Sequence, residues 1–284
     1  MKLSLIVSTY NRPDALDAVL HGLQLQRGIS NAEWEILIAD DGSGAETAAV
    51  VRRWQKILGN RLLRHVWHED KGFRLAAIRN RAAIQAKGEY LVFIDGDCIP
   101  FPDFVAMHLK LAEPGKSVAG NRILLSEPIT RELLASSLPH APALWSKWQW
   151  FKGWLGKDVN KALGWLRMDL GSWRDRNAGD WRVYRGCNFG VWARDYRTLD
   201  GMDEAFSGWG YEDSDFAVRL LRHGVRIKDG RFAVPVLHLW HRENDRSRQE
   251  ENWRRFEASL HGTHVRATRG LSSLDQPVSS EVSS

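Results

Sequence analysis

The sequence predicts an α/β fold in which helices flank a mostly parallel central sheet. Two observations lead to this prediction. Over the first hundred residues, short apolar segments rich in β-branched residues alternate with longer segments of helical periodicity. Polar residues follow several of the apolar segments directly, at the positions where a parallel sheet collects its ligand-binding side chains.

The first hundred residues are expected to supply four strands and three helices in alternation. The strands are predicted at 2–8, 33–40, 61–68 and 90–94, because these segments are short and apolar. One helix is predicted to begin near Pro13, since proline fits a first helical turn, and the others to cover 45–58 and 74–86.

After residue 120 the pattern is less regular. We expect a short helix within 126–142, strand character at 183–195, a helix at 216–222 and a strand at 231–241. The chain is rich in serine from residue 268, so 268–284 is expected to be a flexible tail.

Composition and charge narrow the classes of function. The net charge of +5 favours acidic partners, but the basic residues are scattered and no nucleic-acid-binding motif is present, so no nucleic acid is expected. Cys98 and Cys187 fit neither a zinc spacing nor a disulfide framework, which favours a reduced, cytoplasmic setting. The apolar N-terminal run, 3–7, is too short for a signal peptide, and no later run could span a bilayer.

An acidic pair follows the apolar strand YLVFI. Gly96 separates Asp95 from Asp97 and allows the chain to turn, so both carboxylates can approach one hard divalent cation. Asp-Gly is equally common in ordinary turns that end a strand, and both interpretations stay open at this point.

Two histidines, His238 and His241, follow another apolar strand. Neutral histidines are frequent metal ligands, and a turn can aim both at one ion, although a strand can also end in ordinary histidines. Asp40 lies at the end of the second strand, where its carboxylate could form hydrogen bonds with a base or ribose. The same residues also fit an ordinary turn followed by a helix cap. Arg74 and Arg79 could bind a diphosphate through their guanidinium groups. Alternatively, they lie on a helix face that is exposed to solvent.

The string GWGYEDSD, at 208–215, places carboxylates beside a tryptophan and two glycines. A general base must lie within hydrogen-bond reach of the hydroxyl that it deprotonates, and a tryptophan can stack on a sugar ring. The glycines let the backbone approach that ring. Acids are also favoured in the first turn of a helix, so both interpretations can hold together.

Taken in order, the motifs STYNRP, IADDGS, FIDGDCIP and GWGYEDSDFAVRL resemble inverting GT-A glycosyltransferases of family 2. The last motif also resembles GWGGEDDD, the C-terminal catalytic segment of β1,4-galactosyltransferases. The resemblance covers most of 1–245. It implies a Rossmann-like GT-A domain over 1–267, with a nucleotide-binding half at 1–120 and an acceptor-binding and catalytic half at 121–267.

The resemblance implies a site for a UDP-sugar donor. Its uracil and ribose would contact Thr9 and Asp40. Asp95 and Asp97 match the DxD motif, which holds Mn²⁺ or Mg²⁺ on the diphosphate. We assign donor-nucleotide binding to Thr9, Asn11, Arg12, Asp40, Arg74, Arg79, Asp95 and Gly96.

The resemblance also implies a metal shell and an acceptor site. His238 and His241 stand where the galactosyltransferases have Met-x-x-His, so they would join Asp95 and Asp97 as metal ligands. The histidine in place of methionine changes the softness of the ligand set. Asp213 matches the catalytic base. We assign sugar and acceptor binding to Trp209, Gly210 and Glu212. Tyr211 stands where the galactosyltransferase motif has glycine.

The activity implied is metal-dependent, inverting transfer of a hexose or N-acetylhexosamine from a UDP-sugar to a saccharide or lipid-linked saccharide. A bacterial lipopolysaccharide or polysaccharide is the expected product. A sugar nucleotidyltransferase, or a carbohydrate- or nucleotide-binding protein without turnover, is the alternative.

The Trp-rich insertion, 143–182, contains seven of the 14 tryptophans, mixed with lysine and arginine. This composition is typical of a surface at the headgroup level of an anionic membrane, and it indicates peripheral contact with the inner face of the cytoplasmic membrane. It fits equally well with tryptophans that pack in the core or line an acceptor groove.

Overall fold

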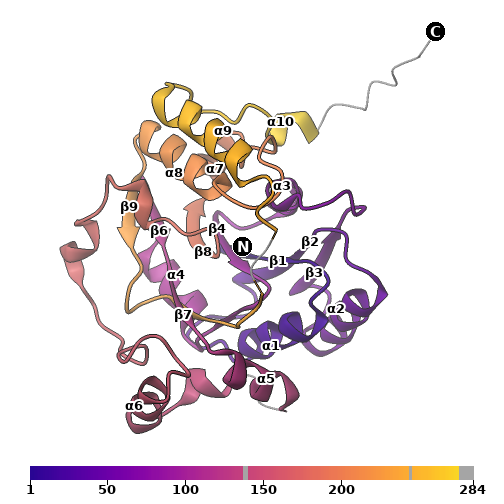
Figure 1. Cartoon of the computed structure of the whole chain (residues 1–284), viewed down its shortest axis with the longest axis vertical. Helices are drawn as coiled ribbons and strands as arrows, with labels where there is room; N and C mark the ends of the chain where they lie inside the picture. The colour runs from indigo at the N-terminus through magenta and orange to yellow at the C-terminus, as the bar shows by residue number, and fades with distance from the viewer. Residues whose placement is uncertain (137–139, 243–244, 275–284) are drawn as a thin grey trace.

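The computed structural model describes residues 1–136, 140–242 and 245–274. Within these residues a seven-stranded sheet forms the centre of the molecule, in the order β3-β2-β1-β4-β8-β6-β9 (Figure 1). All neighbouring strands in it are parallel except that β8 runs antiparallel to both β4 and β6, so the expected mostly parallel sheet is confirmed. The strands are β1 (Leu3–Thr9), β2 (Trp34–Asp40), β3 (Leu63–Trp67), β4 (Tyr90–Asp95), β6 (Lys116–Ala119), β8 (Asn188–Trp192) and β9 (Arg226–Asp229).

Three short strands form a second sheet, in the order β5-β10-β7. They are β5 (Cys98–Pro100), β7 (Asn121–Leu124) and β10 (Pro235–His238). β10 is shorter than the strand expected at 231–241. It begins only at Pro235, because the chain first makes a turn at 230–234, where the Ala233 N–H donates to the Gly230 carbonyl. β10 pairs antiparallel with β5 and parallel with β7, which places His238 opposite both Cys98 and Leu124.

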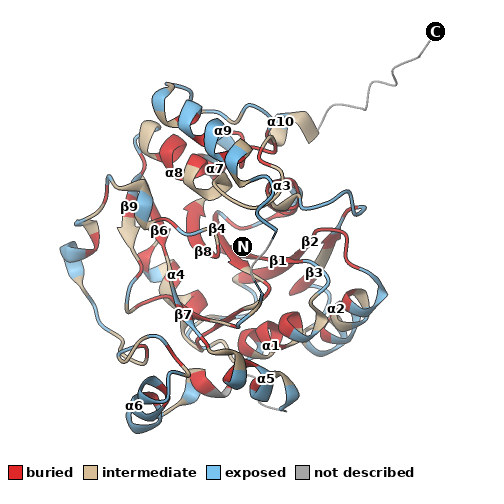
Figure 2. Ribbon diagram, viewed as in Figure 1, coloured by how far each residue is buried: buried red, intermediate tan, exposed pale blue. Residues whose placement is uncertain are grey.

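Helices cover both faces of the large sheet. On one face α1 (Pro13–Gln24), α2 (Ala45–Leu58) and α4 (Phe104–Leu111) share a buried apolar cluster with Leu5 and Val7 of β1. On the other, α3 (Leu75–Gln85), α7 (Ala193–Thr198) and α8 (Glu212–Arg222) share a second cluster with Ile6. Because alternate residues of a strand point to opposite faces, both sets are buried, as Figure 2 shows for the central strands.

The rest of the described chain supplies peripheral helices. They are α5 (Glu127–Ala135), α6 (Lys147–Leu155), α9 (Gln249–His261) and α10 (Leu271–Leu274), with the 3₁₀ turns η1 (Ala141–Leu144), η2 (Gly171–Asp175) and η3 (Trp181–Val183). Two expected boundaries differ. Only 188–192 of the segment 183–195 is a strand, because η3 and α7 occupy its ends, and α8 begins four residues earlier than expected.

The expectation of a flexible tail is wrong for 268–274. The Thr268 N–H donates to Asp203 Oδ2 at 2.8 Å, and the Ser272 hydroxyl donates to Asp200 Oδ2 at 2.7 Å. These two buried aspartates bind the segment to the domain, and α10 follows. The rest of the expected tail, 275–284, lies outside the described residues.

The Trp-rich insertion is divided between the core and the surface. In α6, Trp150 is fully buried, and its ring stacks with Phe101 at 6.4 Å between centroids. Trp148 and Trp154 of the same helix are 62% and 43% exposed. The core interpretation therefore holds for one side of α6 and not for the other. Among the described residues, no helix is long and apolar enough to cross a membrane.

This division predicts different stability effects within one helix. Replacing Trp150 with alanine should lower the free energy of unfolding by about 3–5 kcal/mol, because a cavity replaces a buried ring. The matched change Trp148→Ala should lower it by no more than about 0.5 kcal/mol. Urea unfolding of both variants measures the difference, and equal losses would contradict the division.

Candidate active site

The register of the central sheet brings the expected site residues to one edge. Thr9 pairs with Asp40, and Ser8 pairs with Asp95, so β1, β2 and β4 all end at the same level. The carboxyl edge of parallel strands is where such sheets bind ligands. The polar residues that follow these strands in sequence are therefore also neighbours in space.

Arg79 is placed differently from the expectation. It projects from α3 and is fully buried, so it does not present its guanidinium to a diphosphate. Nε donates to Ser8 Oγ at 2.9 Å, and Nη2 donates both to Asp95 Oδ1 at 2.7 Å and to the Gly186 carbonyl at 2.8 Å. Arg79 is thus a positioning residue that links β1, β4 and the turn before β8.

Asp40 also differs from its expected role. Its side chain is fully buried, Oδ1 accepts the Ser43 N–H at 2.8 Å, and Oδ2 lies 2.8 Å from His65 Nε2. Burial opposes ionisation, but the hydrogen bonds from His65 and Ser43 outweigh it and lower the pKa of Asp40 below its usual value. Asp40 therefore holds the loop after β2, and its carboxylate is not exposed to a nucleotide.

The other expected donor-binding residues surround this edge. Thr9 is buried, and its hydroxyl has no hydrogen-bond partner among the described residues. The Asn11 carboxamide accepts the Gly44 N–H at 3.0 Å. Arg12 is half-buried beside Asp14. Arg74 donates to the Glu69 carbonyl through its side chain and to Asp41 Oδ2 through its backbone.

Gly96 is required by a close approach of two strands. Its N–H donates to the Ser8 carbonyl at 2.6 Å, and a Cβ at this position would lie 2.7 Å from the same oxygen. The chain can therefore cross the end of β1 only with glycine here. This crossing separates Asp95, which contacts Arg79, from Asp97, which lies on the other side.

Asp97 faces the two histidines that were expected as metal ligands. Its Oδ1 lies 3.8 Å from His238 Nε2, and its Oδ2 lies 3.4 Å from His241 Nε2. The pairing of β5 with β10 causes this convergence, because it sets Cys98 opposite His238. Asp97, Cys98 and His238 form a group whose ligand atoms lie within 4.8 Å of one another. Asp95 is outside this group, beside Arg79.

Asp213 is oriented by backbone N–H groups at the start of α8. Oδ2 accepts the Gly186 N–H at 2.7 Å, and Oδ1 accepts the Ser214 N–H at 2.7 Å. Since the Gly186 carbonyl also accepts a hydrogen bond from Arg79, the backbone of this one residue connects the expected base to the buried arginine. Sequence reasoning did not identify Gly186.

Glu212 lies beside Asp213, and its Oε2 is buried without a hydrogen-bond partner among the described residues. Burial raises the pKa of Glu212 to about 7, and the neighbouring Asp213 carboxylate adds to the shift. An unpartnered, buried carboxylate oxygen suits a ligand hydroxyl, because it gains a hydrogen bond only when a ligand is bound.

Tyr211 adopts a left-handed backbone conformation, with φ of 70°. Such a conformation costs a non-glycine residue about 1–2 kcal/mol per residue. The ring compensates by packing on α9, where it stacks with Phe256 at 5.6 Å between centroids and meets Trp253 edge-on at 5.3 Å. The left-handed Tyr211 is thus stabilised by aromatic contacts.

Trp209 is half-buried in the loop before α8. The Arg246 guanidinium lies 5.0 Å from its ring centroid, and Asn252 Nδ2 donates to its carbonyl at 3.3 Å. Gly210 has φ of 110°, a conformation that L side chains rarely adopt, which explains the glycine.

One sequence signal could have identified the buried role of Arg79. Leu75, Ile78, Arg79 and Ala82 lie on one helical face, and Ile78 and Ala82 are fully buried. An arginine within an apolar face is a sign of a paired guanidinium, because arginine is rarely buried without a partner.

We predict that Arg79→Met lowers the free energy of unfolding by about 1–3 kcal/mol, because it leaves Ser8 and the Gly186 carbonyl without the hydrogen bonds of a fully buried guanidinium. The matched variant Arg81→Met changes an exposed residue of the same helix. It should change the free energy of unfolding by no more than about 0.5 kcal/mol. Urea unfolding measures both. If the two variants unfold at the same urea concentration, Arg79 is not the central contact.

Solved structures with a similar fold include TarS from S. aureus and the mannosyltransferase PcManGT from Pyrobaculum calidifontis. TarS superposes with a TM-score of 0.59 at 17% identity, over 90% of this chain and 39% of that one. PcManGT gives a TM-score of 0.57 at 19% identity, over 90% of this chain and 61% of that one. At such low identity these likenesses establish the fold.

Curated relatives include the validoxylamine A glucosyltransferase of Streptomyces hygroscopicus subsp. limoneus, which is 29% identical over 78% of this chain and 48% of its own length. The chondroitin synthase of Pasteurella multocida is 28% identical over 81% of this chain and 24% of its own length. The chain thus spans about half the length of the first and about a quarter of the second.

Two family models match the chain. The model of glycosyl transferase family 2 matches residues 4–200, and the model described as the N-terminal domain of galactosyltransferase matches residues 176–241. The second match contains the GWGYEDSD string and both histidines, so both parts of the expected resemblance are confirmed. The chain belongs to glycosyl transferase family 2 and has the GT-A fold.

Proposed function

We propose that this protein is a metal-dependent, inverting glycosyltransferase that moves a hexose or N-acetylhexosamine from a UDP-sugar to a saccharide hydroxyl. The observation that carries the proposal is the convergence at one sheet edge of Asp97 with two histidines, beside Glu212 and Asp213. A site of this kind combines cation ligands, a hydroxyl-binding acid and an oriented carboxylate.

The relatives support the donor and product classes. TarS has been solved in complex with UDP and with UDP-GlcNAc, and PcManGT in complex with GDP-Man and Mn²⁺. Relatives named as glucosyltransferase and chondroitin synthase support a bacterial polysaccharide or lipopolysaccharide as the product. We therefore retain a UDP-sugar as the proposed donor.

The side chains present fit a divalent cation. Asp97 offers carboxylate oxygens, and His238 and His241 offer Nε2 atoms aimed at that carboxylate. These three residues would hold the ion, with buried Cys98 beside them. Mn²⁺ or Mg²⁺ bound there would neutralise negative charge on the leaving nucleotide diphosphate.

The protein groups have distinct roles in the proposed transfer. Asp213, held by the Gly186 and Ser214 N–H groups, accepts the proton of the acceptor hydroxyl as its oxygen bonds to the anomeric carbon. The bond to the UDP oxygen breaks in the same displacement, so the anomeric configuration inverts. Glu212 binds a sugar hydroxyl through its unpartnered oxygen, and Trp209 packs against a sugar ring.

We predict that Asp213→Asn lowers turnover by about 10²–10⁴-fold, since the amide cannot accept the proton. Turnover is measured as UDP release, with and without Mn²⁺. The donors are UDP-glucose, UDP-galactose and their N-acetylamino analogues. The isosteric variant Glu212→Gln should mainly raise KM for the sugar, because it alters a hydroxyl contact.

The opposite pattern, with turnover lost in Glu212→Gln and kept in Asp213→Asn, would assign the base to Glu212. Pyrophosphate release with sugar phosphates would indicate a nucleotidyltransferase. Binding of UDP-sugars without any turnover would indicate a binding protein. Chelation of the cation by EDTA should abolish transfer.

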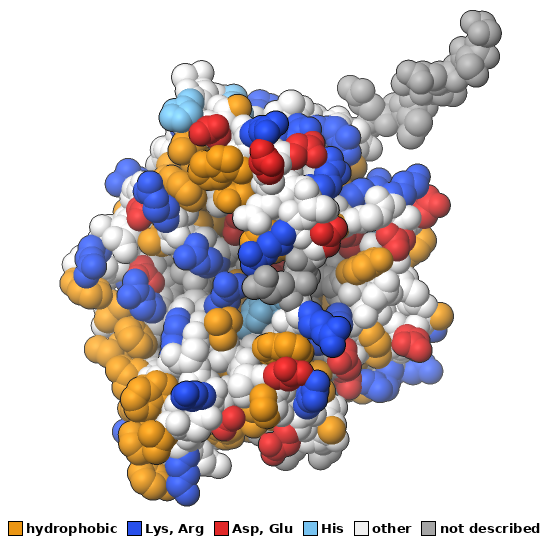
Figure 3. All heavy atoms as spheres, viewed as in Figure 1, with side chains coloured by type: hydrophobic (Ala, Val, Ile, Leu, Met, Phe, Trp, Pro, Cys, Tyr) orange, Lys and Arg blue, Asp and Glu red, His pale blue; other side chains and the backbone are white. Residues whose placement is uncertain are grey.

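We also propose that the outer side of α6 rests on an anionic membrane at its inner face. Figure 3 shows apolar side chains interspersed with basic ones at the lower left, where α6 lies. The exposed apolar residues there include Trp148, Phe151, Trp154 and Leu155. Lys152 lies 5.4 Å from the Trp148 ring centroid, so charge and aromatic surface are presented together.

Flotation with vesicles of phosphatidylglycerol and phosphatidylcholine tests this surface. Wild-type protein should float with them at low salt, and the double variant Trp148→Ser, Leu155→Ser should bind at least about tenfold more weakly. Ile57→Ser alters an exposed apolar residue of α2 and should leave flotation unchanged. Absence of wild-type protein from the vesicle fraction at low salt would refute membrane contact.

A further inference from the structure

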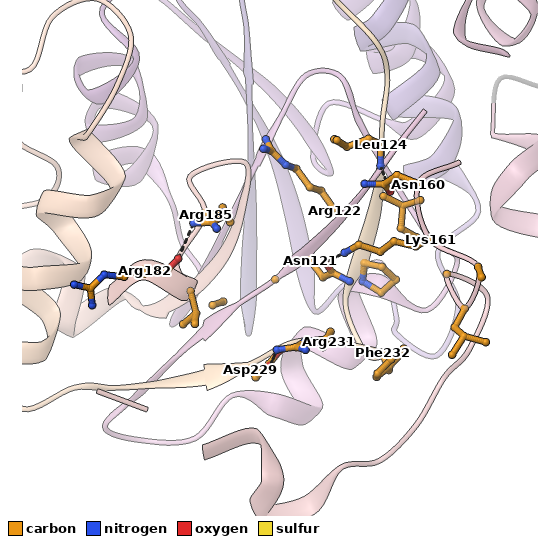
Figure 4. A pocket seen from close by; sticks show the side chains of 18 residues that line it. Asn121, Arg122, Leu124, Asn160, Lys161, Arg182, Arg185, Asp229, Arg231 and Phe232 are labelled. Atoms are coloured by element: carbon orange, nitrogen blue, oxygen red, sulfur yellow. Dashed lines mark hydrogen bonds and ion pairs between the residues drawn. The ribbon is translucent and has the colours of Figure 1, made fainter. Parts of the chain in front are cut away.

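A pocket of about 660 Å³ lies beside the second sheet, away from the edge formed by β1, β2 and β4 (Figure 4). Its walls come from β7, the segment 160–164, the segment 182–185 and the turn between β9 and β10. A volume of this size accommodates a ligand of several rings. Its segment 160–164 and Arg182 belong to the Trp-rich insertion, but sequence reasoning assigned none of the lining residues to a site by name.

Basic side chains dominate the lining. Five of them, Arg122, Lys161, Arg182, Arg185 and Arg231, surround the pocket from different segments, as Figure 4 shows, and one acidic side chain, Asp229, lines it with them. Asp229 Oδ2 accepts a hydrogen bond from Arg231 at 2.7 Å, so that acid is already paired.

Three of these cations lack an acidic partner. Among the described residues, no carboxylate forms an ion pair with Arg122, Lys161 or Arg185. Lys161 donates to Asn121 Oδ1, and Arg185 donates to the carbonyls of Arg182 and Tyr184. Neutral oxygens satisfy the donors but leave the positive charge without compensation.

The titration of Lys161 reflects this excess of positive charge. Burial lowers the pKa of the Lys161 ammonium, and the guanidinium groups of Arg231 and Arg122 lower it further. An anion in the pocket would offset the repulsion between the Lys161 ammonium and the two guanidinium groups, because it supplies the missing opposite charge.

The pocket adjoins the catalytic residues on the side away from the nucleotide edge. Arg185 directly precedes Gly186, whose N–H holds Asp213, and Leu124 of the lining pairs with His238 in the second sheet. None of the residues at the ends of β1, β2 and β4 lines the pocket. Its position therefore suits the acceptor rather than the donor diphosphate.

We propose that this pocket binds an acidic group of the acceptor, so that the acceptor class is an anionic saccharide bearing a carboxylate or a phosphate. Arginine binds both groups through paired N–H donors, and Phe232 and Leu124 offer apolar surface to the sugar rings. The identification of the ligand as an acceptor rests on the proposed glycosyl transfer.

Calorimetry with three short oligosaccharides tests the proposal. They differ only in the terminal unit, which is glucose, glucuronic acid or glucose 6-phosphate. The wild type should bind at least one acidic form about tenfold more tightly than the neutral form, since a charged group is paired. Arg122→Gln and Lys161→Gln should each reduce that preference about tenfold, and the stronger acidic ligand identifies the group.

Arg52→Gln is the matched control, because Arg52 is exposed on α2 and does not line the pocket, and it should retain the full preference. Equal binding of acidic and neutral forms by the wild type would overturn the proposal, as would a preference that both pocket variants retain. UDP binding is measured separately. Failure of UDP to bind would count against the proposed transferase function, while the preference for acids would still be measurable.

Discussion

The contacts of one buried guanidinium determine the geometry of the candidate site. Arg79 joins Ser8, Asp95 and Gly186, and the N–H of Gly186 holds Asp213, so Asp213 is positioned through α3 as well as through its own helix. Desolvating an arginine offsets much of the gain from its ion pair, while removing one partner leaves a buried charge. The interaction therefore contributes to the arrangement of the edge more than to net stability.

The two charged regions of the molecule are adjacent but opposite in sign. Asp95, Asp97, Glu212 and Asp213 repel one another at the sheet edge, and burial together with this repulsion raises the pKa of Asp95 despite Arg79. The basic pocket lies beyond Gly186. This polarity separates a region that suits a cation from one that suits an anion.

Local patterns predicted the strands, the helix at 45–58 and the residues that collect at the sheet edge, because periodicity and turn residues specify them within a few positions. Partners distant in the chain could not be predicted. The roles of Asp40 and Arg79 depend on His65 and Gly186, and that of Asp97 depends on the pairing of β5 with β10. The basic pocket was missed for the same reason, since its lining comes from four separate segments.

Tyr211 changes how the loop before α8 can move. A glycine at this position interconverts freely between left- and right-handed conformations, so a loop that contains it can act as a hinge. Here the ring is held by Phe256 and Trp253, and rotation of the backbone would require separation of three aromatic rings. The loop is consequently preorganised, and less conformational entropy remains to be lost when a ligand binds. Helix α9 therefore holds the segment 208–212 in one conformation without any ligand.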